Sequence, residues 1–465
     1  MDNTGAPGLN TLFISGLDGD TRRYRCFHHQ EQLALVGVHS GFRESDDPHL
    51  LVEALDFNVF ILHRVPFSPL IDALINLAHS RGKPVVFETD DLVVAPELYD
   101  QIGYADSLSP EAARKFRQEL DQLAETFQRC DCVLTTTQFL ADEVSRRGKP
   151  TYVHRNAPSE EMFRISEEAF DNRSKRLDAG QGKGGPVTVG YFSGTGSHNR
   201  DFRAIKDALF WALETYPQLR IHISGHLDLP EEFGLYEHRI GRAPYVTWRE
   251  LPYLIAEVDI NLAPLEQDNP FCRAKSENKF VEAALVGVPT IASRVEAFEY
   301  AIDHGRYSFL ASTTDEWTQS LQTLLDDPEA RRTMGEAARR SVYARYQPKQ
   351  SAGHLLETLG VIAGRFGGDP ASPEQLLRGF ADGIGAYLDQ TRSESRALLL
   401  QLQDLRRAMD EREERSAFFV AQMEQQQADL LKQLAERDRT IEAIMQGRVM
   451  RAMTRVQTWF RRFRR

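Results

Sequence analysis

The sequence of 465 residues predicts an α/β protein with two doubly wound lobes and a long helical extension. Short Val- and Ile-rich runs alternate with helical periodicity over residues 11–155, and the same alternation returns after a glycine-rich stretch near residue 180. Beyond Gly368, strand signals nearly disappear and Gln, Glu, Arg and Leu dominate. We therefore expect a first lobe at 1–168, a linker at 169–186, a second lobe at 187–368, a helical region at 369–447 and a tail at 448–465.

The first lobe is expected to hold a parallel sheet with helices on both faces, because its apolar runs are short and continuous. The expected strands lie at 11–15, 59–63, 84–88, 132–136 and 151–154, and the expected helices lie near 69–80, 110–128 and 138–147.

The second lobe is expected after the Gly-rich sequence GQGKGGP, which is typical of a linker. The pattern leaves open whether a last helix near 349–363 returns to the first lobe. The expected strands lie at 187–194, 219–225, 259–264, 307–312 and just before residue 293, and helices are expected from about 201, at 248–258 and up to about 345.

The bulk properties exclude several classes of protein. The net charge of −12 argues against wholesale nucleic-acid binding, and the hydrophobic content of 41% is that of an ordinary globular chain. We find no signal-peptide pattern and no apolar run of the ~18 residues that a membrane span needs. The four cysteines are too scattered for a zinc site. We expect a cytoplasmic protein with reduced thiols.

Residues 259–293 carry the clearest chemical signal. A buried strand leads through an acidic loop into a helix with a basic start, and such loops lie at the carboxyl edge of a parallel sheet, where anions bind. Lys275, Asn278 and Glu282 share one helix face, with Lys279 beside them. Cations in a first turn oppose the helix dipole, so they favour an anionic ligand such as a diphosphate. A carboxylate two turns on suits a sugar diol. The alternative is an ordinary buried helix with solvated lysines.

The helical region shows an imperfect heptad pattern. It predicts a coiled coil that joins copies of the chain, and the alternative is a single amphipathic helix that lies on the lobes. The last residues, GRVMRAMTRVQTWFRRFRR, contain seven arginines and no acid. This composition favours an interfacial helix on a membrane surface over a contact with nucleic acid or an acidic protein. The heptad positions are Leu398, Leu402, Leu405, Met409, Phe419, Met423 and Leu430.

Several motifs resemble one known family. The order Glu282, Gly287, Pro289, followed by a buried strand, resembles the second-lobe signature of the GT-B glycosyltransferases of the group 1 (family 4) type. Other segments resemble a bacterial branch associated with surface polysaccharide and O-antigen assembly. The likeness covers roughly residues 10–362, and its segments are RAKSENKFVEAALVGVP, GYFSGTGSHNRDF, ELPYLIAEVDINLAPLE and FETDDL.

The resemblance implies a GT-B fold of two Rossmann-like lobes with a cleft. It implies transfer of a sugar from a nucleotide-diphosphate sugar to a glycan or lipid-linked acceptor, with retention and without a metal or cofactor. Glu282 matches the glutamate that binds the nucleotide ribose, and Asn278 shares its helix face. Arg273 and Lys275 are the expected catalytic cations beside the diphosphate. Further donor contacts are expected from Ser193, Gly194, Thr195 and Arg200.

The sequence departs from the family at Ala274, where a second glutamate usually contacts the transferred sugar. This leaves the sugar and the stereochemical outcome open. Glu266, Asp268 and Glu277 are the candidate substitutes.

The first lobe is expected to hold the acceptor. Arg22 and Arg25 follow its first strand, and His63 ends the second expected strand, so all three are candidates to bind the acceptor or a phosphate. Alternatively, this arginine-bearing loop is solvated. Asp91 is the candidate to orient the acceptor hydroxyl, and the alternative is that it caps the following segment.

Two other classes remain compatible with the sequence. One is a catalytically inactive GT-B scaffold that organises polysaccharide-assembly enzymes at the membrane through its coiled coil, which Ala274 and the helical extension allow. The other is a sugar-nucleotide epimerase with the same two-lobed fold.

Overall fold

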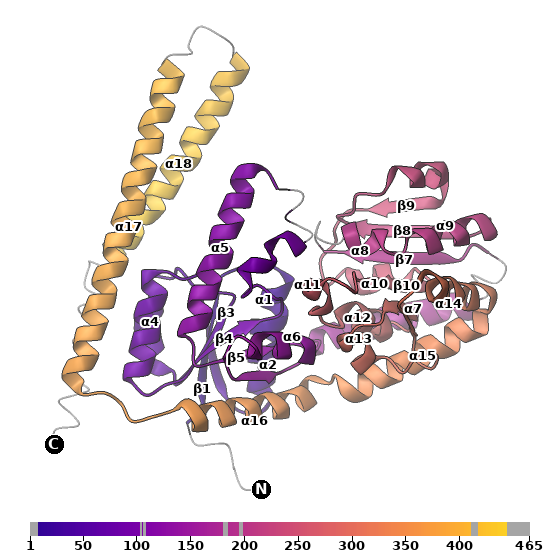
Figure 1. The fold of residues 1–465 in the computed structure, drawn as a ribbon, viewed down its shortest axis with the longest axis horizontal. Coiled ribbons are helices and arrows are strands. Elements are labelled where there is room, and N and C mark those ends of the chain that lie inside the picture. The colour runs from indigo at the N-terminus through magenta and orange to yellow at the C-terminus, as the bar shows by residue number, and fades with distance from the viewer. Residues whose placement is uncertain are drawn as a thin grey trace.

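Two six-stranded, entirely parallel sheets form the centres of two lobes that lie side by side (Figure 1). The computed structural model describes residues 8–102, 105, 108–179, 185–194, 199–410 and 417–443. A helical hairpin projects from the first lobe, and two consecutive helices run beneath the lobes, one under the second and one under the first (Figure 1). The predicted fold class is confirmed.

The sheet of the first lobe has the strand order β2-β1-β3-β4-β5-β6. The five predicted strands are confirmed. The edge strand β2 was missed because its sequence, HSGFRE, contains no apolar run and its side chains are half-buried or exposed. The strands are β1 (Asn10–Ser15), β2 (His39–Glu44), β3 (Val59–His63), β4 (Val85–Thr89), β5 (Cys132–Thr135) and β6 (Thr151–Val153).

Helices cover both faces of this sheet, and the three predicted helices are confirmed as α4, α5 and α6. Each begins at a Ser or Thr whose side chain accepts a hydrogen bond from the first turn. The helices are α1 (Asp20–Arg22), the π-helix η1 (Arg23–Phe27), α2 (His28–Leu35), α3 (Leu50–Glu53), η2 (Ala54–Asp56), α4 (Pro69–Ser80), η3 (Pro96–Gln101), α5 (Pro110–Arg129) and α6 (Gln138–Ser145).

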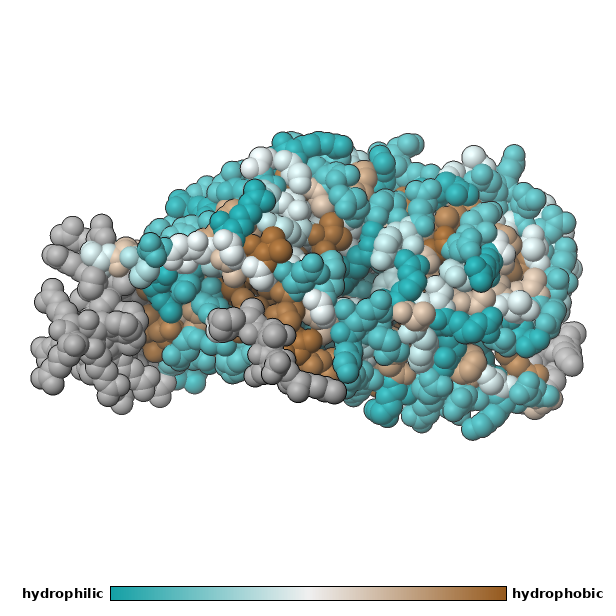
Figure 2. Space-filling model, turned by 90° about the horizontal axis from the view of Figure 1, so that it is seen from below, coloured by the Kyte–Doolittle hydropathy of each residue, from teal (hydrophilic) through white to brown (hydrophobic). Residues whose placement is uncertain are grey.

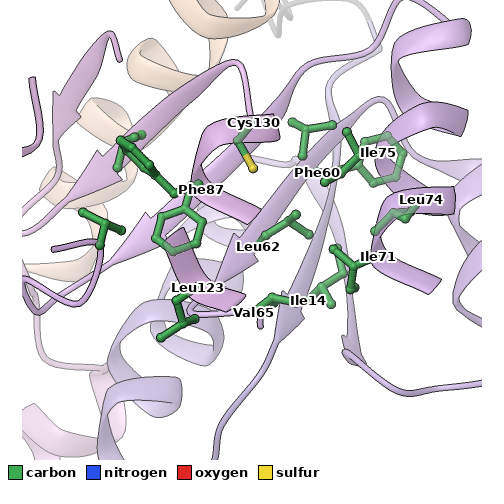
Figure 3. Close-up of a cluster of buried hydrophobic side chains, with 14 of the residues drawn as sticks. Ile14, Phe60, Leu62, Val65, Ile71, Leu74, Ile75, Phe87, Leu123 and Cys130 are labelled. Carbon is green, nitrogen blue, oxygen red and sulfur yellow. The ribbon is translucent and has the colours of Figure 1, made fainter. Parts of the chain in front are cut away.

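The core of the first lobe lies between the sheet and helices α4 and α5. Phe60 and Leu62 of β3 point toward Ile71 and Leu74 of α4 (Figure 3). All four side chains are buried. This packing fixes the carboxyl ends of the strands, where the site residues of the first lobe lie.

The sheet of the second lobe has the order β12-β11-β10-β7-β8-β9. The predicted strands are confirmed, and the added strand β9 is an exposed edge strand, again without an apolar run. The strands are β7 (Thr188–Ser193), β8 (Arg220–Gly225), β9 (Ile240–Ala243), β10 (Ile260–Ala263), β11 (Thr290–Ser293) and β12 (Phe309–Ala311). The helices are α7 (Glu160–Asp178), α8 (Asn199–Arg203), α9 (Lys206–Thr215), η6 (Glu231–Arg239), α10 (Leu251–Ala256), α11 (Pro270–Arg273), α12 (Asn278–Leu285), α13 (Glu296–Ala301), α14 (Thr314–Asp326) and α15 (Pro328–Arg345).

Helix α7 differs from the linker expected at 169–186, because it continues to Asp178 and packs on the second lobe. Ala169 is fully buried against α10, and the Arg173 guanidinium donates to the carbonyl oxygens of Ala256 and Val258. The polar sequence concealed a helix whose buried arginine caps the end of α10 and the chain before β10.

Helix α16 (Pro348–Phe366) returns to the first lobe, which settles the point that the sequence left open. Its Leu355, Leu359 and Ile362 are buried in one cluster with Phe13 and Leu33 of the first lobe. Residues 348–366 therefore pack on the first lobe, although the predicted boundary placed them with the second.

The extension folds back on itself as an antiparallel hairpin of α17 (Pro373–Asp410) and α18 (Ala417–Ala443) (Figure 1). Arg437 pairs with Glu394 across the hairpin at 2.9 Å, and Leu402 of the predicted seam is buried. The lower part of α17 packs on α4, where Tyr387 enters the core of the first lobe. One predicted seam position is thus buried within a single chain, while the homo-oligomer stays a prediction. The basic tail lies outside the described residues.

The face seen from below is mostly hydrophilic, and its apolar side chains gather mainly in the half occupied by the first lobe (Figure 2). Across the part of the chain that is described, no helix has both the length and the hydropathy needed to cross a bilayer.

Candidate donor site between the lobes

A cavity of about 230 Å³ lies between the two lobes. It opens at the carboxyl ends of β7 and β8 and at the start of α12, as expected for an open parallel sheet. Residues of the first lobe form its opposite wall. The lining residues are Asp20, Thr21, Arg23, Tyr24, Asp90, Phe192, Ser193, Gly194, Ser224, Tyr245, Val246, Trp248, Leu251, Ile255, Asn261, Asn278, Lys279 and Glu282.

Helix α12 presents a cation and a carboxylate to this cavity, one turn apart. The Nζ of Lys279 is buried and has no hydrogen-bond acceptor among the described residues, and it lies 4.4 Å from the centre of the Tyr191 ring. Burial lowers the pKa of Lys279 to about 8. Burial also raises the pKa of Glu282, against the opposing effect of Arg23. Burial thus disfavours the charged form of both side chains.

The wall from the first lobe is built by α1 and η1. The Arg23 guanidinium donates to Asp20 at 3.0 Å and lies over the rings of Tyr24 and Trp248, at 4.5 Å and 4.9 Å. The Tyr245 hydroxyl donates to the second oxygen of Asp20 at 2.8 Å. These contacts close one side of the cavity with residues from both lobes.

The other end of the cavity is apolar and aromatic, with Phe192, Val246, Trp248 and Leu251 among its lining residues. Such a surface suits a planar base, and the hydroxyl of Ser224 lies nearby. The cavity therefore offers an apolar surface, a cation and a carboxylate, which are the groups that a nucleoside diphosphate needs.

The expected site residues Ser193, Gly194, Asn278 and Glu282 are brought together in this cavity. Thr195 lies outside the described residues. Lys279, expected beside Lys275, Asn278 and Glu282, also lines the cavity. Arg23 and Tyr24 belong to the arginine-bearing loop of the first lobe, but the sequence did not single them out, because their role depends on burial and on contacts between the lobes.

Two expected cations of the donor site lie elsewhere. Arg273 is exposed and stacks on the Phe139 ring at 4.4 Å, so it does not line the cavity. Arg200 borders a separate hollow with Asp268 and Glu266. Both follow the expected strands, but the turn of the short helices α8 and α11 decides which side chains reach the cavity.

Lys275 also does not line the cavity, because it is engaged by Asp91. Its Nζ lies 2.7 Å from Asp91 Oδ1, and Arg64 approaches the other oxygen at 3.1 Å. Arg64 has φ 45°, a left-handed conformation that is costly for a side-chain-bearing residue. Asp90, by contrast, does line the cavity. The expected catalytic residues Asp91 and Lys275 thus form one ion pair between the lobes.

The expected acceptor residues have structural partners. Arg22 forms a bidentate pair with Glu44 at 2.8 Å and 2.9 Å. Arg25 is fully buried, and its Nε donates to Glu88. His63 is fully buried, with its Nδ1 3.0 Å from the Ser15 hydroxyl. Glu44 and Glu88 thus compensate the two arginines within the first lobe. A role of Arg22, Arg25 and His63 at an acceptor or phosphate stays a prediction.

Ala274 occupies an apolar contact between the lobes. Its side chain is buried in the cluster that contains Phe271 and the core of the first lobe, and its carbonyl accepts from Thr137 Oγ1 at 3.2 Å. Of the candidate substitutes, Glu277 is buried and pairs with Arg155 and with the Tyr346 hydroxyl. It is thus held away from a ligand.

Glu266 belongs to a group with Asp201 and Cys272, whose ligand-type atoms lie within 4.8 Å of one another. The backbone amide of Glu266 donates to Asp201, and Asn269 donates to the Glu266 carboxylate at 2.9 Å. Hydrogen bonds within the chain therefore account for this cluster.

The two lobes and the cavity between them define the GT-B fold, the fold of a large class of glycosyltransferases. Similar solved structures share it. The Anabaena protein Alr3699/HepE, in complex with UDP and glucose, has a TM-score of 0.52 and 16% identity, covering 76% of this chain and 100% of that one. A glycosyltransferase from Rickettsia africae has a TM-score of 0.50 and 11% identity, covering 77% and 98%.

The sequence itself matches a family over part of its length. Residues 203–357 match the family described as glycosyl transferase-like. A D-inositol 3-phosphate glycosyltransferase of Pseudarthrobacter chlorophenolicus is 30% identical over 130 residues. That match covers 26% of this chain and 30% of the relative, so the chain spans under a third of the curated relative's length. Most of the family match lies in the second lobe, which holds α12.

Proposed function

We propose that this protein is a glycosyltransferase that transfers a sugar from a nucleotide-diphosphate sugar to a glycan or lipid-linked acceptor. One observation carries the proposal: Lys279 and Glu282 face the same cavity from one side of α12. A buried ammonium without an acceptor among the described residues suits the diphosphate, and the carboxylate suits the ribose hydroxyls. The apolar end beyond them suits the base.

Catalysis then depends on charge that develops on the departing diphosphate. Lys279 would stabilise this charge in a site shielded from water by both lobes, and Arg23 would add a second positive charge from the first lobe. We propose that the transfer retains configuration and needs no metal, so activity should persist in the presence of EDTA.

UDP is the first ligand to test, because the similar Anabaena protein was crystallised with UDP and with UDP-glucose. Calorimetry on the full chain should show that Glu282→Ala weakens UDP binding by at least ~10-fold, the loss expected for a charge-assisted hydrogen bond. Glu299→Ala, on the exposed face of α13, is the matched control and should bind as the wild type does. Unchanged affinity in Glu282→Ala would contradict the assignment of the donor site. If the wild type does not bind UDP, GDP and dTDP are the next probes.

We further propose a role in bacterial surface-polysaccharide assembly, such as that of O-antigen. A catalytically inactive scaffold is the second candidate, and it is favoured by Ala274, which lies in an apolar contact instead of supplying a carboxylate to a sugar. Nucleotide release from UDP-, GDP- or dTDP-sugars in the presence of a membrane extract would separate the two. Release above the background of the Glu282→Ala variant supports the enzyme.

Peripheral membrane binding is proposed from the seven arginines of the last nineteen residues. The chain should bind vesicles that contain anionic lipid, and truncation after Gln446 should abolish binding. Equal binding by the truncated chain would contradict this role. Light scattering on the full chain tests the proposed homo-oligomer.

A further inference from the structure

We propose that Tyr24, a residue of the first lobe, positions Glu282 for the ribose of the donor, so that the nucleotide site is complete only when the lobes are closed. This inference rests on the proposed function. It assigns Tyr24 as a positioning residue, which acts through Glu282 and not on the reacting atoms.

The contact between these side chains is direct and spans 258 residues of sequence. The Tyr24 hydroxyl donates to Glu282 Oε1 at 2.9 Å. Among the described residues, no group other than the Tyr24 hydroxyl donates a hydrogen bond to this carboxylate. The other oxygen, Oε2, is thus left to accept from a ligand hydroxyl in the cavity that Glu282 lines.

The phenol is itself held firmly in place. Tyr24 is only 4% exposed, and its ring packs edge-on against His28 with 4.8 Å between the ring centres. The Arg23 guanidinium lies over the ring, and the Met162 sulfur lies 3.6 Å from the hydroxyl. The terminal torsion of a glutamate is soft, so a fixed donor on one oxygen fixes the plane of the carboxylate.

Two neighbouring contacts couple this hydrogen bond to the position of the lobes. Asp20 accepts from Arg23 and from Tyr245 of the second lobe, and Arg23 lies over Trp248. Asp20, Arg23 and Tyr24 are close in sequence and move with the first lobe. Separation of the lobes would therefore remove the donor from Glu282 and weaken the nucleotide site.

The geometry favours positioning over competition. A competing phenol would occupy the oxygen that the ribose needs, and its removal would tighten nucleotide binding. A positioning phenol leaves Oε2 available, so that its removal loosens binding.

The test is a double-mutant cycle with UDP binding as the readout, measured by calorimetry on the full chain. Tyr24→Phe should weaken UDP binding by ~10-fold, because a hydrogen bond to a charged group is lost. In the Glu282→Ala background, the same substitution should change the affinity by less than about 2-fold, since residues that act through one contact are not additive. Tyr245→Phe removes the bond to Asp20 that couples the two lobes, so its effect on UDP binding should also shrink in that background.

The outcomes separate this inference from the proposed function. Wild-type or tighter binding by Tyr24→Phe, with Glu282→Ala still weakened, would overturn the positioning role and leave the donor site intact. A Tyr24→Phe effect that is fully additive with Glu282→Ala would also overturn it, by indicating a general structural role. Unchanged UDP affinity in Glu282→Ala would instead contradict the proposed function.

Discussion

The Nζ of Lys275 lies 2.7 Å from Oδ1 of Asp91, and this ion pair connects the turn before α12 with the chain that follows β4. A cation expected at the donor phosphates is thus compensated by a carboxylate of the first lobe. Arg64 binds the other oxygen of the same carboxylate at 3.1 Å. The ion pair is part of the contact between the lobes. Lys279, and not Lys275, lines the cavity.

Substitution of this pair should therefore affect stability more than nucleotide recognition. Lys275→Met and Asp91→Asn should each lower the free energy of unfolding, and the double variant should lose less than the sum, with a coupling of ~1 kcal/mol for a partly exposed pair. UDP affinity of Lys275→Met should stay within about 3-fold of wild type, since a compensated, partly exposed cation adds little binding energy. Denaturant titrations and calorimetry measure both. Additive stability losses, or a large loss of UDP affinity, would contradict this role.

The pKa of Lys279 predicts how donor binding depends on pH. Burial places this pKa at about 8, below the ordinary value of 10.5, so the free protein loses the charge as pH rises through 8. UDP affinity should fall above that pH, by at most tenfold per pH unit for one proton. Lys279→Arg should flatten the dependence, because a guanidinium stays protonated. Calorimetry between about pH 6.5 and 9.5, roughly 1.5 units on each side of this pKa, tests the effect. A wild-type curve parallel to that of Lys279→Arg would contradict it.

The same burial predicts a conflict between binding and stability. Below pH 8 the free protein holds a buried ammonium that the unfolded chain exposes to water, and this cost disappears as pH rises from 8 to 10.5. Lys279→Met should therefore raise the melting temperature at pH 7 while it weakens UDP binding by at least ~10-fold. Thermal denaturation without ligand measures the first effect. A lower melting temperature for Lys279→Met would show that the ammonium is compensated.

Much of the fold was predictable because the central strands are continuous apolar runs with helical periodicity between them. The strands β2 and β9 were not predictable, since exposed edge strands such as HSGFRE carry no such run. The end of α7 was also not predicted, because its polar residues look exposed in the sequence. Arg173 is buried there only because it donates to the carbonyl oxygens of Ala256 and Val258, which are distant in sequence.

The candidate site was predictable in part. Glu282 and Ser193 were each predicted from a motif formed by neighbouring residues in the sequence, and both line the cavity. The sequence of the arginine-bearing loop does not indicate which arginine reaches the cavity. Arg23 lines it, whereas Arg25 is buried against Glu88. The distinction arises from the π-helix η1, whose turn directs neighbouring residues to opposite environments, and from a carboxylate 63 residues away.

Glu88 should give the stability of the protein a pH dependence of its own. This carboxyl is fully buried, and burial raises its pKa to about 7 although Arg25 opposes the shift. The unfolded value is 4.5, so the folded state binds more protons between pH 4.5 and 7, and stability falls as pH rises across this window. The free energy of unfolding of wild type, minus that of Glu88→Gln, should decrease by ~2 kcal/mol from pH 5 to 8. Parallel curves for the two proteins would contradict the shift.

The helical hairpin packs on the first lobe where Gly383 of α17 meets Ala73 of α4. A Cβ added at Gly383 would lie 2.2 Å from the Cβ of Ala73 on α4, whereas a Cβ at Gly385 would meet nothing within 4 Å. Gly383→Leu should therefore push α17 away from α4, at a cost of about 1–3 kcal/mol for overpacking. Gly385→Leu is the matched control, with the same added side chain on an open surface of the same helix.

Hydrogen exchange of α4 and α17 measures the attachment. Gly383→Leu should speed exchange in both helices, since Tyr387 leaves the core of the first lobe, while UDP affinity stays unchanged because the donor cavity is formed by other elements. Gly385→Leu should exchange as the wild type does. If the two variants behave alike, α17 is held by its pairing with α18 and not by the first lobe, and the hairpin would then be free to pair with another chain.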